Sequence, residues 1–363
     1  MATSTPTAVF CSFRLGGADG VSVETKKWEW ALRELGFTTR RVAGDFADGL
    51  RPDDTWLPFL EINPLPGTRS EPDALGAALA GADLVVVENL CSLPLNEVAA
   101  TVTATVLAGH DGRVLFHHHD LPWERPDLAH LDAFPPRHPD ALHVTINEQA
   151  RAALANRGID AHVIRNAFDL NPIPGDGPAT RRAQGFAPND VVLLQPTRAI
   201  PRKEVGRGIQ FAEAIAARLS DRAVRFWITG PAEDGFGPEL DRLVQDATIP
   251  VAIGRAARPG DAYAAADVVV FPSSWEGFGN PPIEGLVANR PVVVAHYPVL
   301  DELLALGLEF LSIDEPGVVA DLVTSGPTPS LESNRAVLKA HFDLADLPGR
   351  IATTCSAVGW THW

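Results

Sequence analysis

Short apolar runs alternate with helical stretches along most of this chain, and that alternation limits the folds open to it. The run at 268–271 reads Val-Val-Val-Phe and ends at Pro272. A strand that is apolar at every position is typical of a parallel sheet covered by helices on both faces. Repeated over 363 residues, the alternation predicts two α/β domains with doubly wound parallel sheets.

Runs of this kind predict strands in both halves of the chain. They lie at 8–13, 38–42, 84–87, 114–117, 142–146, 162–164, 191–195, 224–229, 251–253, 268–271, 292–295 and 309–311. The expected helices lie at 22–35, 73–80, 95–107, 148–157, 205–219, 238–246, 261–265, 283–288 and 301–306, with a last helical stretch from 331 onward. A linker is expected at 166–188, which carries four prolines and three glycines.

Bulk composition excludes several classes of partner. The formal net charge of −16 argues against a surface for nucleic acid or for an anionic membrane. Three widely spaced cysteines form neither a disulfide framework nor a zinc motif, which favours a reducing cytoplasm. With no signal peptide and no long apolar run, we expect no membrane insertion and a cytoplasmic protein.

The most informative motif follows the run at 268–271. Residues 275–284 read Trp-Glu-Gly-Phe-Gly-Asn-Pro-Pro-Ile-Glu, with Glu276 and Glu284 eight positions apart. A strand, a glycine turn and a helix start direct backbone N–H groups at a ligand, which suits a phosphate. Two carboxylates beside an anion site suit the hydroxyls of a sugar and a ribose. The alternative is an ordinary helix start whose acidic residues favour the dipole.

The pattern Glu-Gly-Phe-Gly-x-Pro-x-x-Glu, after a strand ending in Pro-Ser, resembles the retaining nucleotide-sugar glycosyltransferases of family 4. The resemblance implies a GT-B fold, in which two Rossmann-like domains leave a central cleft. An acceptor-side domain is expected at 1–167, a nucleotide-sugar-binding domain at 168–340, and a C-terminal helix at 341–363 that packs back on the first domain. The residues implied to bind the donor here are Glu276, Gly277, Phe278, Gly279, Asn280 and Glu284.

Residues 195–203 resemble a second signature of that family, which holds the donor diphosphate. Arg198 and Lys203 correspond to its two cations; arginine is a fork for phosphate oxygens and lysine a mobile point charge. The chain departs from the family where Pro196-Thr197 replaces a glycine before the arginine and where Glu204 replaces a glycine after the lysine. The alternative is a solvated basic turn with Arg202 as its exposed member.

Three adjacent histidines end the strand predicted at 114–117. Neighbours on a strand point to opposite faces, so His117, His118 and His119 cannot all bind one metal ion. The resemblance instead implies that His119, with Asp120 beside it, faces the donor sugar near the anomeric centre. The alternative is a strand-end histidine that bonds only to backbone.

Other segments carry weaker signals. Gly16 and Gly17 resemble a family loop near the donor phosphate, although a plain tight turn also explains them. Gly230 resembles a family turn near the nucleotide. The spacing at 16–20 is not the dinucleotide fingerprint, so no nicotinamide cofactor is predicted. Trp123 could stack on an acceptor sugar, or be a core residue beside a surface ion pair.

Together with these patterns, the resemblance implies an enzyme that moves a hexosyl unit from a UDP- or GDP-sugar to a small soluble polar acceptor, with retention and by front-side displacement. We expect no metal and no cofactor beyond the donor. Three rivals stay open: a nucleotide-sugar epimerase or hydrolase on the same fold, a non-catalytic binding subunit, and a metal-dependent enzyme built on residues 117–119.

Overall fold

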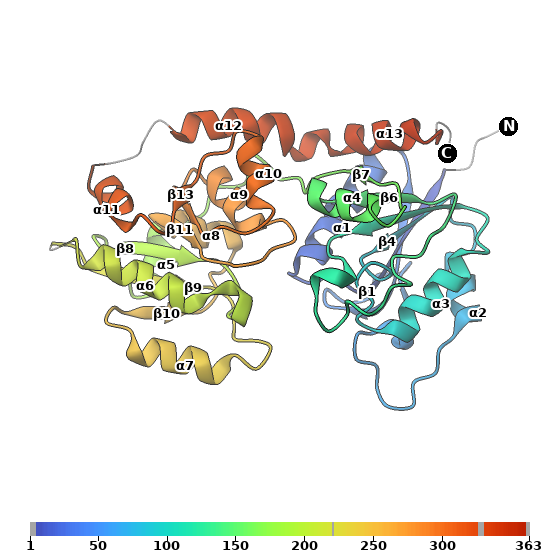
Figure 1. The fold of residues 1–363 in the computed structure, drawn as a ribbon, viewed down its shortest axis with the longest axis horizontal. Coiled ribbons are helices and arrows are strands. Elements are labelled where there is room, and N and C mark those ends of the chain that lie inside the picture. The colour runs from blue at the N-terminus through green and yellow to red at the C-terminus, as the bar shows by residue number, and fades with distance from the viewer. Residues whose placement is uncertain (1–4, 220, 326–329, 361–363) are drawn as a thin grey trace. The chain divides into compact units, whose positions relative to one another are not determined.

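The computed structural model of the chain describes residues 5–219, 221–325 and 330–360. It divides into two compact units. Unit 1 is the chain up to Ala167 together with the chain from Leu344, and unit 2 is Phe168–Asp343. Each unit is a parallel sheet with helices packed on it (Figure 1), which confirms the predicted α/β class.

The sheet of unit 1 has the strand order β3-β2-β1-β4-β5-β6-β7. Its strands are β1 (Thr7–Leu15), β2 (Thr38–Phe46), β3 (Thr55–Trp56), β4 (Leu84–Glu88), β5 (Arg113–His118), β6 (Leu142–Thr145) and β7 (His162–Val163). All the paired strands are parallel, and β1 lies between β2 and β4. The direction of winding therefore reverses beside β1, where ligands bind in folds of this kind.

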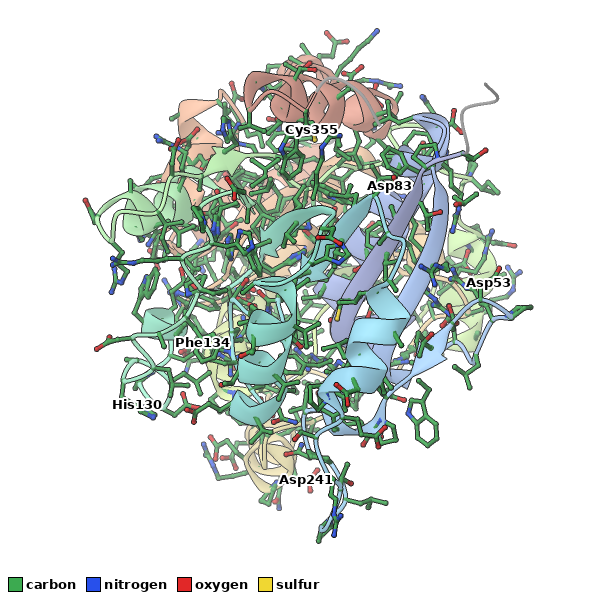
Figure 2. The ribbon with its side chains drawn as sticks, turned by 90° about the vertical axis from the view of Figure 1, so that its right-hand side faces the viewer. Asp53, Asp83, His130, Phe134, Asp241 and Cys355 are labelled. Atoms are coloured by element: carbon green, nitrogen blue, oxygen red, sulfur yellow. The ribbon has the colours of Figure 1, made fainter. Side chains whose placement is uncertain are left out.

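Alternate residues of β1 enter two separate cores, one on each face of the sheet. Val9 and Cys11 pack with α2 (Pro72–Leu79) and α3 (Glu97–Leu107). Their neighbours Ala8 and Phe10 pack on the other face with α1 (Gly20–Glu34) and with α13 (Leu347–Ala357), which carries the buried Cys355 labelled in Figure 2. The helix α4 (Glu148–Ala155) follows β6. All three cysteines are buried free thiols.

Unit 2 repeats the architecture with the strand order β10-β9-β8-β11-β12-β13. The strands are β8 (Val191–Gln195), β9 (Val224–Ile228), β10 (Val251–Ile253), β11 (Val268–Phe271), β12 (Val292–Val294) and β13 (Leu311–Ser312). The helices are α5 (Gly177–Ala183), α6 (Val205–Ala216), α7 (Gly237–Asp246), α8 (Pro259–Ala265), α9 (Asn280–Val287), α10 (Leu300–Ala305), α11 (Pro316–Ser325) and α12 (Ser330–His341). Short 3₁₀ turns are η1 (Pro58–Leu60), η2 (Pro122–Glu124), η3 (Pro201–Lys203) and η4 (Leu344–Asp346).

The linker predicted at 166–188 is wrong over its middle, because α5 forms there and packs against α8. Asp176 caps this helix by accepting a hydrogen bond from the backbone of Ala179 at 2.9 Å. Pro178 stands in the first turn, where a missing N–H costs nothing. The built Cβ of Gly177 would lie 2.4 Å from the carbonyl of Ala264, so the glycine permits close contact with α8. Strand β3 and helix α11 were also not predicted.

No helix in the described part of the chain is long and apolar enough to cross a membrane.

Candidate active site

The loops after β8 and β11 carry the charged motifs of unit 2. These strands are neighbours in the sheet and run parallel, so the segments that follow them lie at the same edge. At that edge Glu276 meets Arg202 at 2.9 Å, and its other carboxylate oxygen contacts the ammonium of Lys203. We call Arg202, Lys203 and Glu276 the cation–carboxylate cluster. The structure thus joins residues from the two sequence motifs.

Burial sets the electrostatics of this cluster. The side chains of Lys203 and Glu276 are each 9% exposed. Burial would raise the pKa of Glu276, but Lys203 and Arg202 hold it below its ordinary value. Burial lowers the pKa of Lys203 to about 8, against the opposing effect of Glu276. The pair is therefore a desolvated ion pair whose lysine titrates closer to neutrality than a surface lysine does.

The alternative for this segment, a solvated basic turn with Arg202 as its exposed member, does not describe Arg202 in the structure. Its guanidinium binds the Glu276 carboxylate, donates to the carbonyl of Trp275 at 3.0 Å and lies over the Trp275 ring. The side chain is 32% exposed. Arg198 instead pairs with Glu233 at 2.6 Å, where both side chains are 39% exposed. Sequence spacing gave no signal for the role of Arg202, because its partner lies in another motif.

Two glycines of unit 2 are needed for close backbone contact. The built Cβ of Gly230 would lie 2.5 Å from the Cα of Arg198, so this turn packs directly on the loop after β8. Gly279 has φ 95° as the cap of α9, and a Cβ there would lie 2.5 Å from the hydroxyl of Tyr297. Tyr297 is fully buried, and its hydroxyl has no hydrogen-bond partner among the described residues. The sequence pattern did not identify Tyr297 as part of this site.

The departure at Glu204 has a structural explanation. Glu204 adopts φ 48° and ψ 47°, the left-handed conformation that glycine takes without strain, and α6 begins directly after it. The backbone therefore keeps the shape that a glycine would give, at a local cost of about 1 kcal/mol.

Among the remaining donor-motif residues Phe278 lies in the core, and Asn280 and Glu284 are partly buried. Phe278 is 3% exposed and packs with Phe168 and Phe342, so only its backbone is left for a ligand. Glu284 accepts a hydrogen bond of 2.5 Å from the hydroxyl of the buried Tyr263. That bond fixes the Glu284 carboxylate on the first turns of α9. Asn280 is the first residue of the same helix.

The glycine loop of unit 1 follows β1. Gly16 has φ 80°, and a Cβ there would lie 1.9 Å from the Asp48 carboxylate, which Arg41 holds at 2.9 Å. The next glycine, Gly17, lies close to Asp19, which caps α1. Packing against these two carboxylates explains both glycines, whichever ligand the loop binds.

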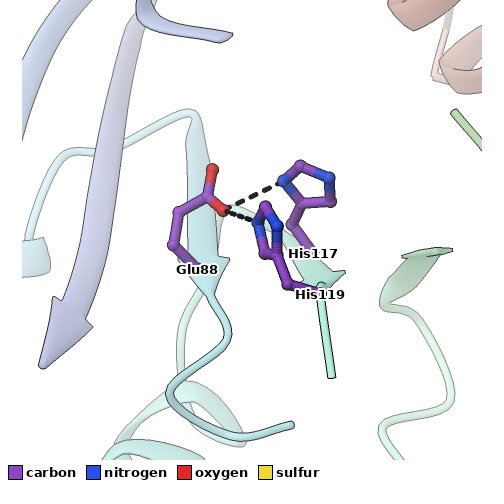
Figure 3. Close-up of side chains that lie close together, drawn as sticks. All are labelled: Glu88, His117 and His119. Atoms are coloured by element: carbon purple, nitrogen blue, oxygen red, sulfur yellow. Dashed lines mark hydrogen bonds and ion pairs between the residues drawn. The ribbon is translucent and has the colours of Figure 1, made fainter. Parts of the chain in front are cut away.

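The three histidines alternate as the strand geometry predicts. Figure 3 shows the imidazoles of His117 and His119 directed at one carboxylate, that of Glu88 at the end of β4. His117 Nδ1 and His119 Nε2 each lie 2.9 Å from its Oε2 atom. His118 points the other way and bonds to Ser92 at 2.6 Å and to His143 at 2.9 Å. We call Glu88, His117 and His119 the histidine–glutamate cluster.

The histidine–glutamate cluster is fully or almost fully buried. Burial would raise the pKa of Glu88, but the two histidines hold it at about 2. Burial lowers the pKa of His117, whereas for His119 the contact with Glu88 outweighs burial and raises the pKa. Within the described residues this is the one set of at least three His, Cys, Asp or Glu whose candidate ligand atoms all lie within 4.8 Å. The hydrogen bonds to Glu88 account for that geometry.

Two expected acceptor residues follow this cluster. The Asp120 carboxylate accepts a long hydrogen bond of 3.4 Å from the Asn89 side chain. Trp123 packs beside Leu121, and the guanidinium of Arg157 lies 3.5 Å from the centre of its ring. A sugar could stack on that face of Trp123 only after Arg157 moves away. Both readings of Trp123 from the sequence therefore stay open.

Comparison with known proteins relates the segment that carries the cation–carboxylate cluster to a family. The family described as "Glycosyl transferases group 1" matches residues 199–324, which include the cation–carboxylate cluster and Glu284. The mannosylglucosylglycerate synthase of Thermotoga maritima is 28% identical, covering 84% of each chain. That of Petrotoga mobilis is 25% identical, covering 83% of this chain and 85% of its own. The chain is a glycosyltransferase, and its residues 199–324 match the group 1 family.

Solved structures agree with this glycosyltransferase assignment at the level of the fold. Anabaena HepE in complex with UDP-glucose superposes with a TM-score of 0.74 at 19% identity, covering 97% of this chain and 99% of its own. The sucrose-phosphate synthase of Thermosynechococcus elongatus has the same TM-score at 14% identity, covering 98% and 100%. The glycosyltransferase therefore has the GT-B fold predicted from its motifs.

Proposed function

We propose that this glycosyltransferase moves a hexosyl unit, with retention, from a UDP- or GDP-sugar to a small polar acceptor. The cation–carboxylate cluster is the observation that carries the proposal. It sets two cations and one carboxylate beside the glycine turn at 277–279, where α9 begins. A diphosphate needs the cations and the amides, and a sugar needs the carboxylate.

In this proposal Arg198, Lys203 and the turn amides stabilise the diphosphate as it departs with growing negative charge. The Lys203 ammonium has three donors, so it can hold Glu276 and a phosphate oxygen at once. Glu276 binds hydroxyls of the donor sugar, and Glu284 binds the ribose. His119 of unit 1 contacts the sugar near the anomeric carbon.

Front-side displacement gives retention without a covalent intermediate. The acceptor oxygen bonds to the anomeric carbon on the face that the diphosphate leaves, and the bond from that carbon to the phosphate oxygen breaks. The acceptor proton passes to the departing phosphate. The anomeric carbon is oxocarbenium-like at the transition state, as in other glycosyl transfers. This chemistry requires no metal, and we propose that the enzyme needs none.

The acceptor chemistry rests on the relatives. Two of them are named mannosylglucosylglycerate synthases and align over more than four fifths of this chain. Their names describe a small, water-soluble sugar acid. We propose an acceptor of that chemistry here, either a polar sugar or a glycosylated hydroxy acid.

Binding is the first test. UDP, GDP, ADP and dTDP are compared by thermal denaturation, each with magnesium and with EDTA. A ligand at a hundred times its Kd adds roughly 2.7 kcal/mol to the stability of the folded state. We expect a clear shift with UDP or GDP alone and the same shift in EDTA. No shift with any nucleotide would contradict the proposed donor site.

Turnover separates the rivals. UDP-glucose and GDP-mannose are incubated with and without a panel of sugars and sugar acids, and the product anomer is assigned by NMR. Acceptor-dependent transfer with retention supports the proposal. Consumption of donor alone indicates an epimerase or hydrolase, and nucleotide binding without turnover indicates a binding subunit. Loss of turnover in EDTA would favour the metal-dependent rival.

A further inference from the structure

Two consecutive residues, Glu88 and Asn89, hold His119 by its ring and by its backbone. Its Nε2 atom lies 2.9 Å from Glu88. Its backbone N–H, like that of Asp120, donates to the side chain of Asn89 at 3.1 Å. Asn89 has φ 59°, which turns the chain sharply after β4 and brings its side chain back to β5. The end of β4 thus fixes both the backbone and the ring of His119.

The carboxylate that binds the His119 ring is Glu88, and packing of the sheet does not explain a carboxylate at this position. Glu88 is fully buried at the end of an otherwise apolar strand. A buried carboxylate is costly unless hydrogen bonds and positive charge compensate it. The Glu88 carboxylate receives its hydrogen bonds from His117 and His119 on one oxygen, while its other carboxylate oxygen has no partner among the described residues. Packing alone would favour an apolar residue here.

The Glu88 contact also decides which nitrogen of His119 can meet a substrate. Because Nε2 is directed at the carboxylate, Nδ1 is the nitrogen left over, and no described residue hydrogen-bonds to it. Glu88 needs an N–H from the ring, so the neutral ring is held as the Nε2–H tautomer. The contact therefore sets both the orientation and the proton position of His119.

We propose that Glu88 is the positioning residue of the enzyme: it holds His119 so that Nδ1 faces the donor sugar, and His117 bonds to the same carboxylate oxygen of Glu88. This rests on the proposed function, because the role of His119 at the sugar is part of it. Glu88 acts through His119 and does not itself touch the sugar.

Other charged groups also face His119 and affect its pKa. Glu24 of α1 is buried and pairs with Lys27, and the Asp120 carboxylate is next along the chain. Both carboxylates favour the charged form of His119, as Glu88 does, while the His117 ring lies tilted against the His119 ring with their centres 4.3 Å apart. Removing the Glu88 charge should therefore lower the pKa of His119 only in part, because Glu24 and Asp120 still raise it.

The test is Glu88→Gln with matched variants. Glutamine keeps the shape and one acceptor oxygen but loses the charge. We expect kcat to fall roughly a hundredfold through misplacement of the ring, with KM for the donor changed less than threefold (about 0.6 kcal/mol). The acid limb of the kcat profile should move to lower pH, because the neutral ring is the working form and the Glu88 charge raises the pKa of His119. Glu88→Asp keeps the charge and should recover part of kcat.

Glu29→Gln is the control, since Glu29 is a buried carboxylate of the same unit paired with Arg51 at 3.1 Å. It should lower the melting temperature and leave the pH profile in place. If Glu88→Gln keeps the wild-type kcat and pH profile, or if Glu29→Gln shifts the profile equally, the positioning role is refuted.

NMR of the imidazole nitrogens gives a readout that does not depend on turnover. Wild-type His119 should titrate above 6.5, with the proton on Nε2 in the neutral form, and Glu88→Gln should lower that pKa. An unchanged tautomer and pKa in Glu88→Gln overturn the inference about Glu88. If the NMR result holds while no transfer is found with any donor, the proposed function fails and the hold on His119 stands.

Discussion

Replacing Glu276 with glutamine tests whether the two donor motifs meet as a buried ion pair. The substitution leaves Lys203 and Arg202 without their counter-charge. Removing one partner of a buried pair costs about 3–5 kcal/mol, and the amide oxygen can still accept from Lys203, so we expect a loss of about 2–4 kcal/mol. Arg202, which is 32% exposed, adds little to this.

The assay is thermal unfolding of Glu276→Gln against Glu233→Gln. The control removes the same charge from an exposed pair in the same unit, where Arg198 and Glu233 are 39% exposed, and such pairs contribute about 1 kcal/mol or less. For a domain of this size 1 kcal/mol corresponds to about 2–4 °C. The transition of unit 2 should therefore fall by at least about 4 °C in Glu276→Gln, and by about 4 °C at most in the control.

Acid pH gives a second check on the same variant. The folded-state pKa of Glu276 lies below the ordinary value for a glutamate. The stability that the ionised Glu276 contributes is therefore fully present at pH values above the ordinary glutamate pKa, and it is lost as pH falls through the folded-state pKa. The difference between wild type and variant should shrink toward acid pH. The variant should also lose most of its turnover, with a smaller loss of nucleotide affinity. Equal melting of Glu276→Gln and Glu233→Gln would refute the buried pair.

Three further predictions concern the donor site. The folded-state pKa of Lys203 is about 8, against an ordinary 10.5, so the free energy of unfolding should rise with pH between those values. Nucleotide affinity should fall above pH 8, because the lysine then loses its charge. Calorimetry should find neither trend in Lys203→Met. Glu233→Gln frees Arg198 from its carboxylate, so titration calorimetry should find tighter nucleotide binding; weaker binding would contradict this. Glu284→Ala should weaken nucleotide binding about threefold to tenfold, which corresponds to the loss of one hydrogen bond. Tyr263→Phe should weaken it less, because it only removes the hydrogen bond that orients Glu284. Unaltered affinity in Glu284→Ala would exclude the ribose role.

The site also shows where local sequence misleads. Phe278 lies inside the most informative motif, yet its side chain belongs to the core with Phe168 and Phe342. Arg202 lies in a basic segment that could equally be a solvated turn, yet it binds Glu276. Pro178 and its neighbouring glycines indicated a linker, although a helix tolerates a proline in its first turn. In each case a partner distant in sequence decides the outcome.

The sequence by itself determined the fold class and the turn at 277–279. A strand covered by helices on both faces must be apolar at every position, so a run such as 268–271 marks a parallel α/β sheet without knowledge of its neighbours. A cap at φ 95° favours glycine, so Gly279 marks the start of α9. Both signals are local, and the strand periodicity likewise placed His117 and His119 on one face.

Tertiary structure alone decided which charges meet. Lys203 and Glu276 are 73 residues apart and contact because β8 and β11 are neighbours in the sheet. Glu88 reaches His119 because β4 lies beside β5. Strand order follows from how whole helices and strands pack, so no window of sequence contains it. The pKa values of these groups depend on the same contacts and on burial, and they too arise only once the sheets have formed.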